Sequence, residues 1–304
     1  MFLAELMHEK GGLGVMKEIV WWNGTFCPIE LVRISPLDRG FLYGDGLFET
    51  IRLQKGKPLW LSEHLDRLKK SLSFFNIKSV GEFFDMEKAG EIIDELCRKN
   101  PHLGEVARLK IIVTRGTNPT LGLPELSFVD NTLQHGPTVL FMATPYTPPS
   151  EADYNRGWAA RILHGRYSPP LGAHKTLNYL FFLWAKEQAR SDGFHEAIIE
   201  DLNGHIAEAS TASLLVFING VWIFPQSQWK LPGVTEGIIA RFLEEDGEKT
   251  EIRPVYKWEL LQADVVWLLN SMVGIMPVCR IDDHVMPNLM AKYASELRKR
   301  LFSG

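Results

Sequence analysis

Residues 195–224, HEAIIEDLNGHIAEASTASLLVFINGVWIF, decide the fold class. Two Asn-Gly pairs, Asn203-Gly204 and Asn219-Gly220, each separate short runs that are rich in apolar residues. An Asn-Gly pair readily adopts the left-handed backbone that a two-residue hairpin turn requires, so this stretch predicts two consecutive β-hairpins. Hairpins give antiparallel strand pairs, whereas a parallel α/β sheet is built from strand–helix–strand units. We therefore predict an α+β protein with largely antiparallel or mixed sheets.

The same pattern continues on both sides of this stretch. Asn23-Gly24 follows a strand-like run at 18–22, and Lys55-Gly56 lies between the apolar runs 47–53 and 58–61. Apolar periodicity predicts helices at 62–75, 86–99, 176–191, from Val234 onward and at 287–301. Apolar runs predict further strands at 106–114, 158–163, 251–256 and 265–270.

Two of these helices have definite expected ends and faces. Ser62 is the expected N-cap of the helix at 62–75, because a serine hydroxyl can accept a bond from a free N–H group of the first turn. The helix at 176–191 is expected to end before Gly193 and to bury four apolar side chains: Leu177, Leu180, Phe181 and Trp184.

The length of 304 residues suggests two domains of roughly 150 residues each. The segment TPYTPPSEAD at 144–153 contains three prolines in ten residues, a composition typical of a stiff, extended connector. We therefore expect a first domain at 16–143, a linker at 144–153 and a second domain at 154–304. Residues 1–15 have the character of an N-terminal extension, with Met16 as a candidate start.

Composition excludes several classes of protein. A net charge of −4 argues against a generally basic surface for nucleic acid. The chain contains no run of about 18 apolar residues and no signal-peptide pattern at its start, so we expect no association with a membrane. Cys27, Cys97 and Cys279 are far apart and odd in number, which favours a reducing cytoplasm over a disulfide framework or a metal site.

The segment Leu231-Pro-Gly-Val-Thr235 is a candidate anion site, because it stands directly before a predicted helix. Free N–H groups at a helix start bind anions, and the threonine hydroxyl adds a donor. Glu236 follows and would repel an anion, so we expect its side chain to face outward. The alternative is a plain Pro-Gly turn with a threonine cap.

Three charged residues are further candidates for chemistry. Lys175 lies at a loop-to-helix junction, where contact with an apolar helix start would lower its pKa and make the amine a nucleophile. Glu208 ends a predicted strand beside several hydroxyl residues and could hold a cationic ring nitrogen. Arg67 could clamp a phosphate or form an exposed ion pair with Glu63. Each could also be a solvated surface charge.

These candidates share one possible use. Pyridoxal phosphate chemistry needs a lysine to bind the cofactor, an acid at the pyridinium nitrogen and a cup for the phosphate. The acid keeps the ring nitrogen protonated, and the protonated ring then accepts the electrons left when a substrate Cα–H bond breaks. Composition and periodicity permit this chemistry without demonstrating it.

Five motifs resemble those of the class IV aminotransferase family, the fold-type IV group of pyridoxal phosphate enzymes. They are DRGFLYGDGLFETIR at 38–52, EHLDRL at 63–68, KTLNYL at 175–180, GHIAEAS at 204–210 and LPGVT at 231–235. They follow the family order and spacing, and the resemblance extends over 22–278. It implies a small α/β domain and a larger pseudo-barrel domain, with pyridoxal 5'-phosphate between them, in a homodimer that acts on a small-molecule amino substrate.

The resemblance also implies roles for individual residues. Lys175 corresponds to the lysine that binds the cofactor covalently and later moves a proton, and Glu208 corresponds to the acid at the pyridine nitrogen. The implied phosphate contacts are Arg67, Val234, Thr235 and Ser271. Further implied cofactor contacts are Ser210, Thr211 and Leu231, and no metal is implied.

Three main activities occur in this family: branched-chain aminotransferase, D-amino-acid aminotransferase and 4-amino-4-deoxychorismate lyase. Thr50 stands where the lyase has a substrate-side threonine and branched-chain enzymes usually have glycine. Residues 270–278, NSMVGIMPV, are similar to the lyase pattern, and residues 115–123, RGTNPTLGL, lack the Arg-x-His carboxylate trap of D-amino-acid enzymes. We therefore expect a lyase that forms 4-aminobenzoate and pyruvate for folate synthesis.

Other features favour the alternative, an aminotransferase acting on branched-chain or D-amino acids with 2-oxoglutarate. Residues 115–123 lack the glycine-rich stretch common in lyases, and their start resembles the D-amino-acid enzymes. Glu236 also replaces the arginine that often follows the threonine of the LPGVT motif. Arg108 and Lys110 are candidates to bind a substrate carboxylate, unless they are exposed strand charges; the other candidate substrate contacts are Tyr43 and Asn270.

Overall fold

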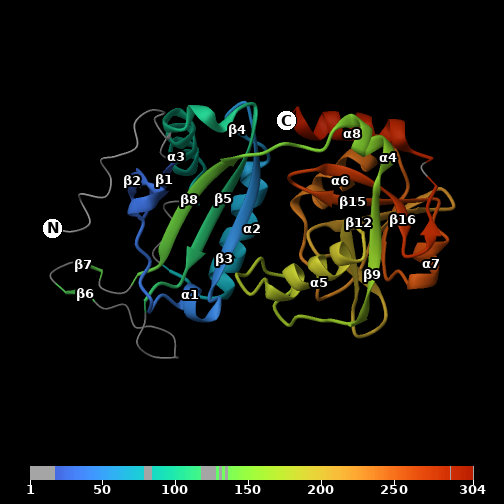
Figure 1. Cartoon of the computed structure of the whole chain (residues 1–304), viewed down its shortest axis with the longest axis horizontal. Helices are drawn as coiled ribbons and strands as arrows, with labels where there is room; N and C mark the ends of the chain where they lie inside the picture. The colour runs from blue at the N-terminus through green and yellow to red at the C-terminus, as the bar shows by residue number, and fades with distance from the viewer. Residues whose placement is uncertain are drawn as a thin grey trace.

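The computed structural model describes residues 18–78, 84–117, 128–129, 132–133, 136–287 and 289–303. Two large sheets, each covered by helices, account for most of these residues (Figure 1). The α+β prediction is confirmed. Among the described residues, every helix is too short or too polar to span a bilayer.

The first sheet has six strands in the order β2-β1-β8-β5-β3-β4, and all neighbours are antiparallel. Its strands are β1 (Ile19–Trp22), β2 (Thr25–Pro28), β3 (Gly46–Gln54), β4 (Lys57–Pro58), β5 (Val106–Thr114) and β8 (Thr138–Pro145). The expected hairpins at Asn23-Gly24 and Lys55-Gly56 are both present, and all four turn residues have positive φ angles. The two-stranded ladder of β6 (Phe128–Val129) and β7 (Thr132–Leu133) is separate.

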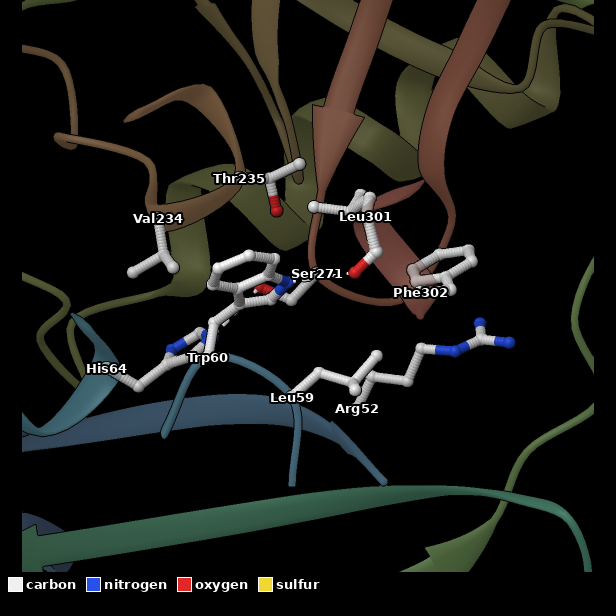
Figure 2. Close-up of a pocket in the computed structure, with 9 residues that line it drawn as sticks. All are labelled: Arg52, Leu59, Trp60, His64, Val234, Thr235, Ser271, Leu301 and Phe302. Atoms are coloured by element: carbon white, nitrogen blue, oxygen red, sulfur yellow. Dashed lines mark hydrogen bonds between the residues drawn. The ribbon is translucent and has the colours of Figure 1, made fainter. Parts of the chain in front are cut away.

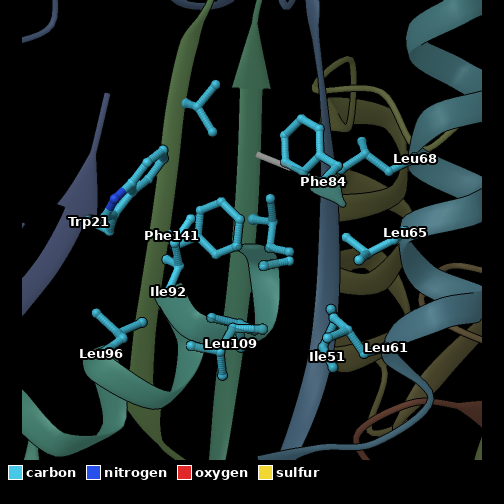
Figure 3. Packing of buried hydrophobic residues seen from close by; sticks show 14 of the residues in the cluster. Trp21, Ile51, Leu61, Leu65, Leu68, Phe84, Ile92, Leu96, Leu109 and Phe141 are labelled. Carbon is cyan, nitrogen blue, oxygen red and sulfur yellow. The ribbon is translucent and has the colours of Figure 1, made fainter. Parts of the chain in front are cut away.

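Helices α2 (Leu61–Phe74) and α3 (Met86–Lys99) cover one face of this sheet (Figure 3). Alternate β3 and β5 residues, such as Ile51 and Leu109, point into the core and meet Leu65 and Ile92 of the two helices. The opposite face of β3 and β5 is not covered by these helices and can line the candidate site.

The second sheet has the order β11-β10-β9-β16-β15-β12-β13-β14, with β17 paired to β16. The strands are β9 (Trp158–Arg166), β10 (Glu196–Glu200), β11 (Ile206–Ala209), β12 (Ser213–Ile218), β13 (Val221–Pro225), β14 (Thr250–Arg253), β15 (Val265–Asn270), β16 (Gly274–Ile281) and β17 (His284–Val285). Three of its strand pairs are parallel and the others antiparallel. The sheet curls into a half-barrel, because β11 at its end also contacts β12 and β13.

The remaining helices are α1 (Arg39–Tyr43), α4 (Glu151–Arg156), α5 (Leu180–Ser191), α6 (Val234–Glu245), α7 (Lys257–Leu261) and α8 (Ala291–Phe302). Helices α6 and α8 pack on the curled sheet around Trp222 and Trp267, both fully buried. Both hairpins predicted for 195–224 are present, as β10–β11 and β12–β13. This confirms the prediction from which the fold class was inferred.

Three helix predictions were wrong at their N-terminal ends. The last helix, expected at 287–301, begins only at Ala291. Helix α2 begins at Leu61 after Trp60, whose φ of 57° places it in the left-handed region, so Ser62 lies in the first turn and is not the N-cap. Helix α5 begins only at Leu180, because backbone bonds hold the preceding residues against β3. Leu180 and Trp184 are 79% and 48% exposed, so the expected burial of these two side chains was wrong.

The chain passes between the two sheets at residues 146–150, after β8 and before α4. The division into domains at 16–143 and 154–304 with a linker at 144–153 remains our proposal; in the structure Thr144 and Pro145 belong to β8 and 151–153 to α4. The extension at 1–15 and the candidate start Met16 lie outside the described residues.

Candidate active site

The loop that carries Lys175 is fastened to the start of β3. The Phe48 N–H donates to the Lys175 carbonyl at 2.9 Å, and the Leu177 N–H donates to the Gly46 carbonyl at 2.9 Å. The Lys175 amine then lies over the Phe48 ring, 4.5 Å from its centroid, and 5.6 Å from the centroid of Tyr179. The loop between β9 and α5 therefore places this amine at the junction of the two sheets.

The Lys175 amine is desolvated. Burial, assisted by the positive charge of Arg67, lowers its pKa from 10.5 to about 8, although Glu49 and Glu208 act in the opposite direction. No ion pair among the described residues includes Lys175. An appreciable fraction of the amine is therefore unprotonated near neutral pH, as a nucleophile requires.

Glu208 lies on β11 with only 8% of its surface exposed. Burial raises the pKa of its carboxyl to about 8, opposed by the N–H of Leu231, which donates to Oε2 at 3.3 Å, and by the charge of Lys175. A buried carboxylate with one hydrogen bond from the described part of the chain is poorly compensated, so a cationic group beside it would be strongly favoured.

A third part of the site surrounds the N-terminus of α6. Val234 and Thr235 lie in its first turn. The N-cap residue, Gly233, has no side chain that could bind the free N–H groups of this turn. Arg67 of α2 reaches across from the first sheet, and its Nη1 donates to the Pro232 carbonyl at 3.0 Å. Val234, Thr235 and Ser271 line one small pocket, with Thr235 almost fully buried (Figure 2). The structure thus brings together the four predicted phosphate residues.

Arg67 does not form the exposed ion pair with Glu63, which instead binds Arg241 of α6. Its guanidinium donates from Nε to Oε1 of Glu49 at 2.8 Å and from Nη2 to Oε2 at 2.6 Å. His64 Nδ1 also lies 2.7 Å from Oε2 of Glu49. Sequence reasoning missed Glu49 and His64, although both lie inside the matched motifs at 38–52 and 63–68.

Ser210 and Thr211 bind a different carboxylate. Both hydroxyls donate to Glu196 of β10, which is fully buried and also accepts from Lys186 Nζ at 3.1 Å. The Ser210 carbonyl accepts from the Tyr179 hydroxyl at 2.9 Å. These two residues, which follow Glu208 in the chain, therefore direct their hydroxyls to Glu196. Sequence reasoning missed this partner.

Glu236 was expected to face outward, and this prediction was wrong. Its side chain is 14% exposed, and Oε1 accepts from Lys230 Nζ at 2.5 Å. Lys230 neutralises the carboxylate beside the helix start, so the repulsion of an anion that motivated the prediction is relieved.

The face of β3 and β5 that points away from α2 and α3 carries polar groups. Phe48 and Thr50 lie on this face by alternation, and Lys110 is the direct cross-strand partner of Thr50. The Lys110 amine lies 5.8 Å from the Phe48 centroid, so Lys110 and Lys175 both contact this ring. Arg108 follows on the same face, stacked 5.1 Å from the Tyr146 centroid. Among the described residues, neither Arg108 nor Lys110 forms an ion pair.

The other two substrate candidates occupy different positions. The Asn270 amide donates to the Thr211 carbonyl at 3.1 Å, and its oxygen accepts from the N–H groups of Met272 and Val273 at 3.0 and 2.9 Å. Asn270 thus holds the turn that carries Ser271. Tyr43 ends α1 and is 51% exposed.

These groups fit pyridoxal phosphate. A desolvated lysine amine, a buried carboxylate and a helix N-terminus with an arginine match the aldehyde, the ring nitrogen and the phosphate, respectively. The described residues contain no group of three or more His, Cys, Asp or Glu side chains placed to hold a metal.

Fold and site together define a fold-type IV pyridoxal phosphate enzyme. The model of the amino-transferase class IV family matches residues 46–281, and the chain belongs to this family. Its members include both aminotransferases and aminodeoxychorismate lyases, so the chain is a pyridoxal phosphate-dependent enzyme of one of these types.

Relatives of both types resemble the chain. It is 30% identical to a putative branched-chain-amino-acid aminotransferase of Methanocaldococcus jannaschii over 93% of each chain. It is 28% identical to an aminodeoxychorismate lyase of Bacillus subtilis over 87% of each chain. The structure matches that of 4-amino-4-deoxychorismate lyase from Pseudomonas aeruginosa with a TM-score of 0.76 and 28% identity, over 93% of this chain and 98% of the other.

Proposed function

We propose that the enzyme is a 4-amino-4-deoxychorismate lyase, which forms 4-aminobenzoate and pyruvate. The observation that carries this proposal is the cross-strand pair Thr50 and Lys110 on the sheet face beside Phe48 and Lys175. This substrate bears two carboxylates, an amine and an enol ether. A hydroxyl and an ammonium beside the lysine suit such a substrate, whereas an aliphatic amino acid calls for an apolar wall.

Arg108 extends the same argument. It lies two residues before Lys110 on β5, and its direct cross-strand partner is Arg52, whose guanidinium donates to the Met272 carbonyl at 2.7 Å. Two cations without an acidic partner among the described residues, Arg108 and Lys110, can neutralise the two carboxylates of one substrate.

Bound pyridoxal phosphate supplies an aldehyde for the substrate amine and a ring that accepts electrons from the carbon bearing that amine. In our proposal Lys175 Nζ holds the cofactor until substrate arrives and then takes the proton from that carbon. A pKa of about 8 suits both tasks, because the amine can accept and return a proton near neutral pH. Loss of the enol-ether side chain as pyruvate is driven by aromatisation, with Thr50 toward the leaving side.

Glu208 would hold a proton at the ring nitrogen. Its carboxylate is unfavourable when alone in this buried position, and a protonated pyridine nitrogen supplies the missing opposite charge. Phosphate contacts would come from Arg67, the N–H groups of Val234 and Thr235, the Thr235 hydroxyl and Ser271, and Leu231 would pack on the ring. Ser210 and Thr211 would hold the backbone next to Glu208 in place through their hydrogen bonds to Glu196.

The alternative is an aminotransferase acting on branched-chain or D-amino acids with 2-oxoglutarate. The relative from Methanocaldococcus jannaschii carries a branched-chain aminotransferase name, and a D-alanine aminotransferase of Bacillus licheniformis is 28% identical over 86% of this chain and 88% of its own. In both reactions Lys175 first removes the proton from the substrate carbon that bears the amine, so this residue does not distinguish the two activities.

We further propose a homodimer in a reducing cytoplasm, where the product would enter folate synthesis. Apolar side chains of α1 and α5 are exposed, and the Asn178 amide, just before α5, donates to the carbonyl of Gly44, just after α1, at 3.2 Å. A contiguous exposed apolar surface is typical of a subunit interface. The three cysteines are free.

One pair of incubations tests the activity. The purified enzyme is given 4-amino-4-deoxychorismate, and 4-aminobenzoate is measured by its fluorescence after chromatography. In parallel it is given amino acids with 2-oxoglutarate, and glutamate is measured. We expect 4-aminobenzoate in the first incubation; glutamate in the second without 4-aminobenzoate in the first would establish the aminotransferase.

A further inference from the structure

The four predicted phosphate residues, Arg67, Val234, Thr235 and Ser271, form a candidate phosphate cup. Two buried side chains, Glu49 and His64, connect to Ser271 of this cup by short contacts, and we call these three side chains the relay. Glu49 is 1% exposed on β3, and His64 is equally buried on α2. His64 Nδ1 lies 2.7 Å from Oε2 of Glu49, and its Nε2 lies 3.3 Å from the Ser271 hydroxyl. The histidine thus joins a buried carboxylate to a residue of the cup. Figure 2 shows His64 and Ser271 in the lining of the same pocket.

The charge of Glu49 fixes which histidine nitrogen carries a proton. Burial alone would raise the pKa of this carboxyl, but Arg67 and His64 lower it to about 2. An ionised carboxylate only accepts hydrogen bonds, so Nδ1 of His64 must be the donor. In the neutral imidazole, Nε2 is then an acceptor.

The state of Nε2 decides what Ser271 can offer an anion. When Nε2 is bare, the Ser271 hydroxyl donates its proton to the histidine and turns only lone pairs to the cup. When Nε2 is protonated, it donates to Oγ, and the Ser271 proton becomes free to bind a phosphate oxygen.

The local charge balance favours the second state when a phosphate is present. Arg67 is tied to Glu49 by two hydrogen bonds, so their charges largely cancel at the cup. Three other charged groups on the surrounding elements are engaged: Arg52 of β3 with the Met272 carbonyl, Glu236 of α6 with Lys230, and Arg298 of α8 with Glu151. Lys175, which interacts with both Arg67 and Glu49, forms no ion pair among the described residues, and in the proposed function its amine is taken up by the cofactor aldehyde. A phosphate monoester carries a charge of about −1.5 to −2 near pH 7, and a proton on His64 would add a positive charge close to it.

We propose that binding of the cofactor phosphate is coupled to uptake of one proton from solvent at Nε2 of His64, which turns the Ser271 hydroxyl into a phosphate donor. This inference rests on the proposed phosphate cup. His64 and Glu49 are positioning residues in this scheme, because they act on the phosphate through Ser271 and Arg67. By linkage, a ligand that binds with proton uptake binds more weakly as pH rises.

The test uses two probes without an aldehyde, 4'-deoxypyridoxine 5'-phosphate and 4'-deoxypyridoxine, so that covalent reaction with Lys175 does not add its own protons. Calorimetric titration of the protein freed of cofactor, in two buffers of different ionisation enthalpy at pH 8, gives the number of protons taken up. We expect the phosphorylated probe to bind with about one proton more in the native protein than in His64→Asn.

Two further variants give the relay its specific signature. Ser271→Ala keeps His64 but removes the hydroxyl, and it should lose this extra proton uptake as His64→Asn does. Both variants should bind the phosphorylated probe about ten- to a hundredfold more weakly. His102→Asn, a histidine outside the site, should leave both the affinity and the proton count unchanged.

The outcomes separate the relay from the site on which it rests. If phosphorylated and unphosphorylated probes bind equally well, the phosphate cup itself is wrongly placed. If the phosphate strengthens binding but His64→Asn takes up as many protons as the native protein, the cup stands and the relay is refuted. Proton uptake that persists in Ser271→Ala would likewise overturn the role of Ser271.

Discussion

The Lys175 amine lies 4.5 Å from the centre of the Phe48 ring, and the Phe48 N–H donates to the Lys175 carbonyl at 2.9 Å. One residue of β3 therefore fixes both the backbone and the side chain of the candidate catalytic lysine. Because β3 also carries Glu49 and Thr50, this single strand connects the lysine, the phosphate cup and the substrate side of the site.

Lys175→Ala should abolish the visible absorbance of the lysine–cofactor adduct and lower turnover by about a thousandfold or more, because the nucleophile and the proton acceptor are lost together. An absorption spectrum of the purified variant checks this. Lys88→Ala, an exposed lysine on α3, is the control and should keep both colour and activity. A visible band that persists in Lys175→Ala would remove this residue from cofactor binding.

Glu208→Gln should alter the pH dependence of stability in the protein freed of cofactor. Folding raises the Glu208 pKa from 4.5 to about 8, so the folded state binds an extra proton between these pH values and loses stability as pH rises through them. The variant should match the native protein near pH 4 and exceed its unfolding free energy by up to about 5 kcal/mol above pH 8. Urea denaturation at several pH values measures the difference.

The same variant should keep bound cofactor but turn over slowly, because a neutral amide holds the ring nitrogen proton less well than a carboxylate does. Steady-state kinetics beside a measurement of cofactor content separates the two effects. Unchanged turnover would exclude Glu208 from the mechanism.

The hairpins were predictable because their turns are local. Asn219 and Gly220 have φ angles of 50° and 81°, which an Asn-Gly pair adopts at little cost. The start of α5 was not predictable, because its expected first turn is held by backbone bonds to β3, more than a hundred residues earlier in the chain. Tertiary contacts there override the apolar periodicity.

The candidate site divides in the same way. Lys175, Glu208 and Arg67 could be found by their motifs, but their partners depend on side chains that meet only after folding. The sequence offers no sign that Ser210 binds Glu196 or that Glu236 binds Lys230. Both pairs form where separate segments of the folded chain converge.

Thr211→Val should lower stability more than it lowers cofactor affinity, because its hydroxyl donates to the buried Glu196. Loss of a hydrogen bond to a buried carboxylate costs about 1.5–3 kcal/mol. Thermal unfolding of the protein freed of cofactor, together with titration by pyridoxal phosphate, distinguishes the effects. A large loss of affinity at unchanged unfolding temperature would mean that this hydroxyl contacts the cofactor directly.

Lys110→Met should raise KM for 4-amino-4-deoxychorismate by about ten- to a hundredfold, because one substrate carboxylate would lose its charged partner. Arg108→Met is the matched comparison on the same strand face, and it should act similarly only if the second carboxylate reaches that far along β5. Steady-state kinetics with each variant makes the comparison. If neither KM changes, the β5 cations do not bind substrate.

Leu180→Glu should separate the proposed dimer. This side chain is 79% exposed at the start of α5, and Phe41 of α1 is 73% exposed, so both are suited to contact with a second copy. A charge at the centre of an apolar interface is costly to bury, because it loses its hydration without gaining a partner. Sedimentation at several concentrations should show a dimer for the native protein and a monomer for the variant. Ile252→Glu, equally exposed but on β14, is the control and should remain dimeric; a native protein that sediments as a monomer would refute the interface.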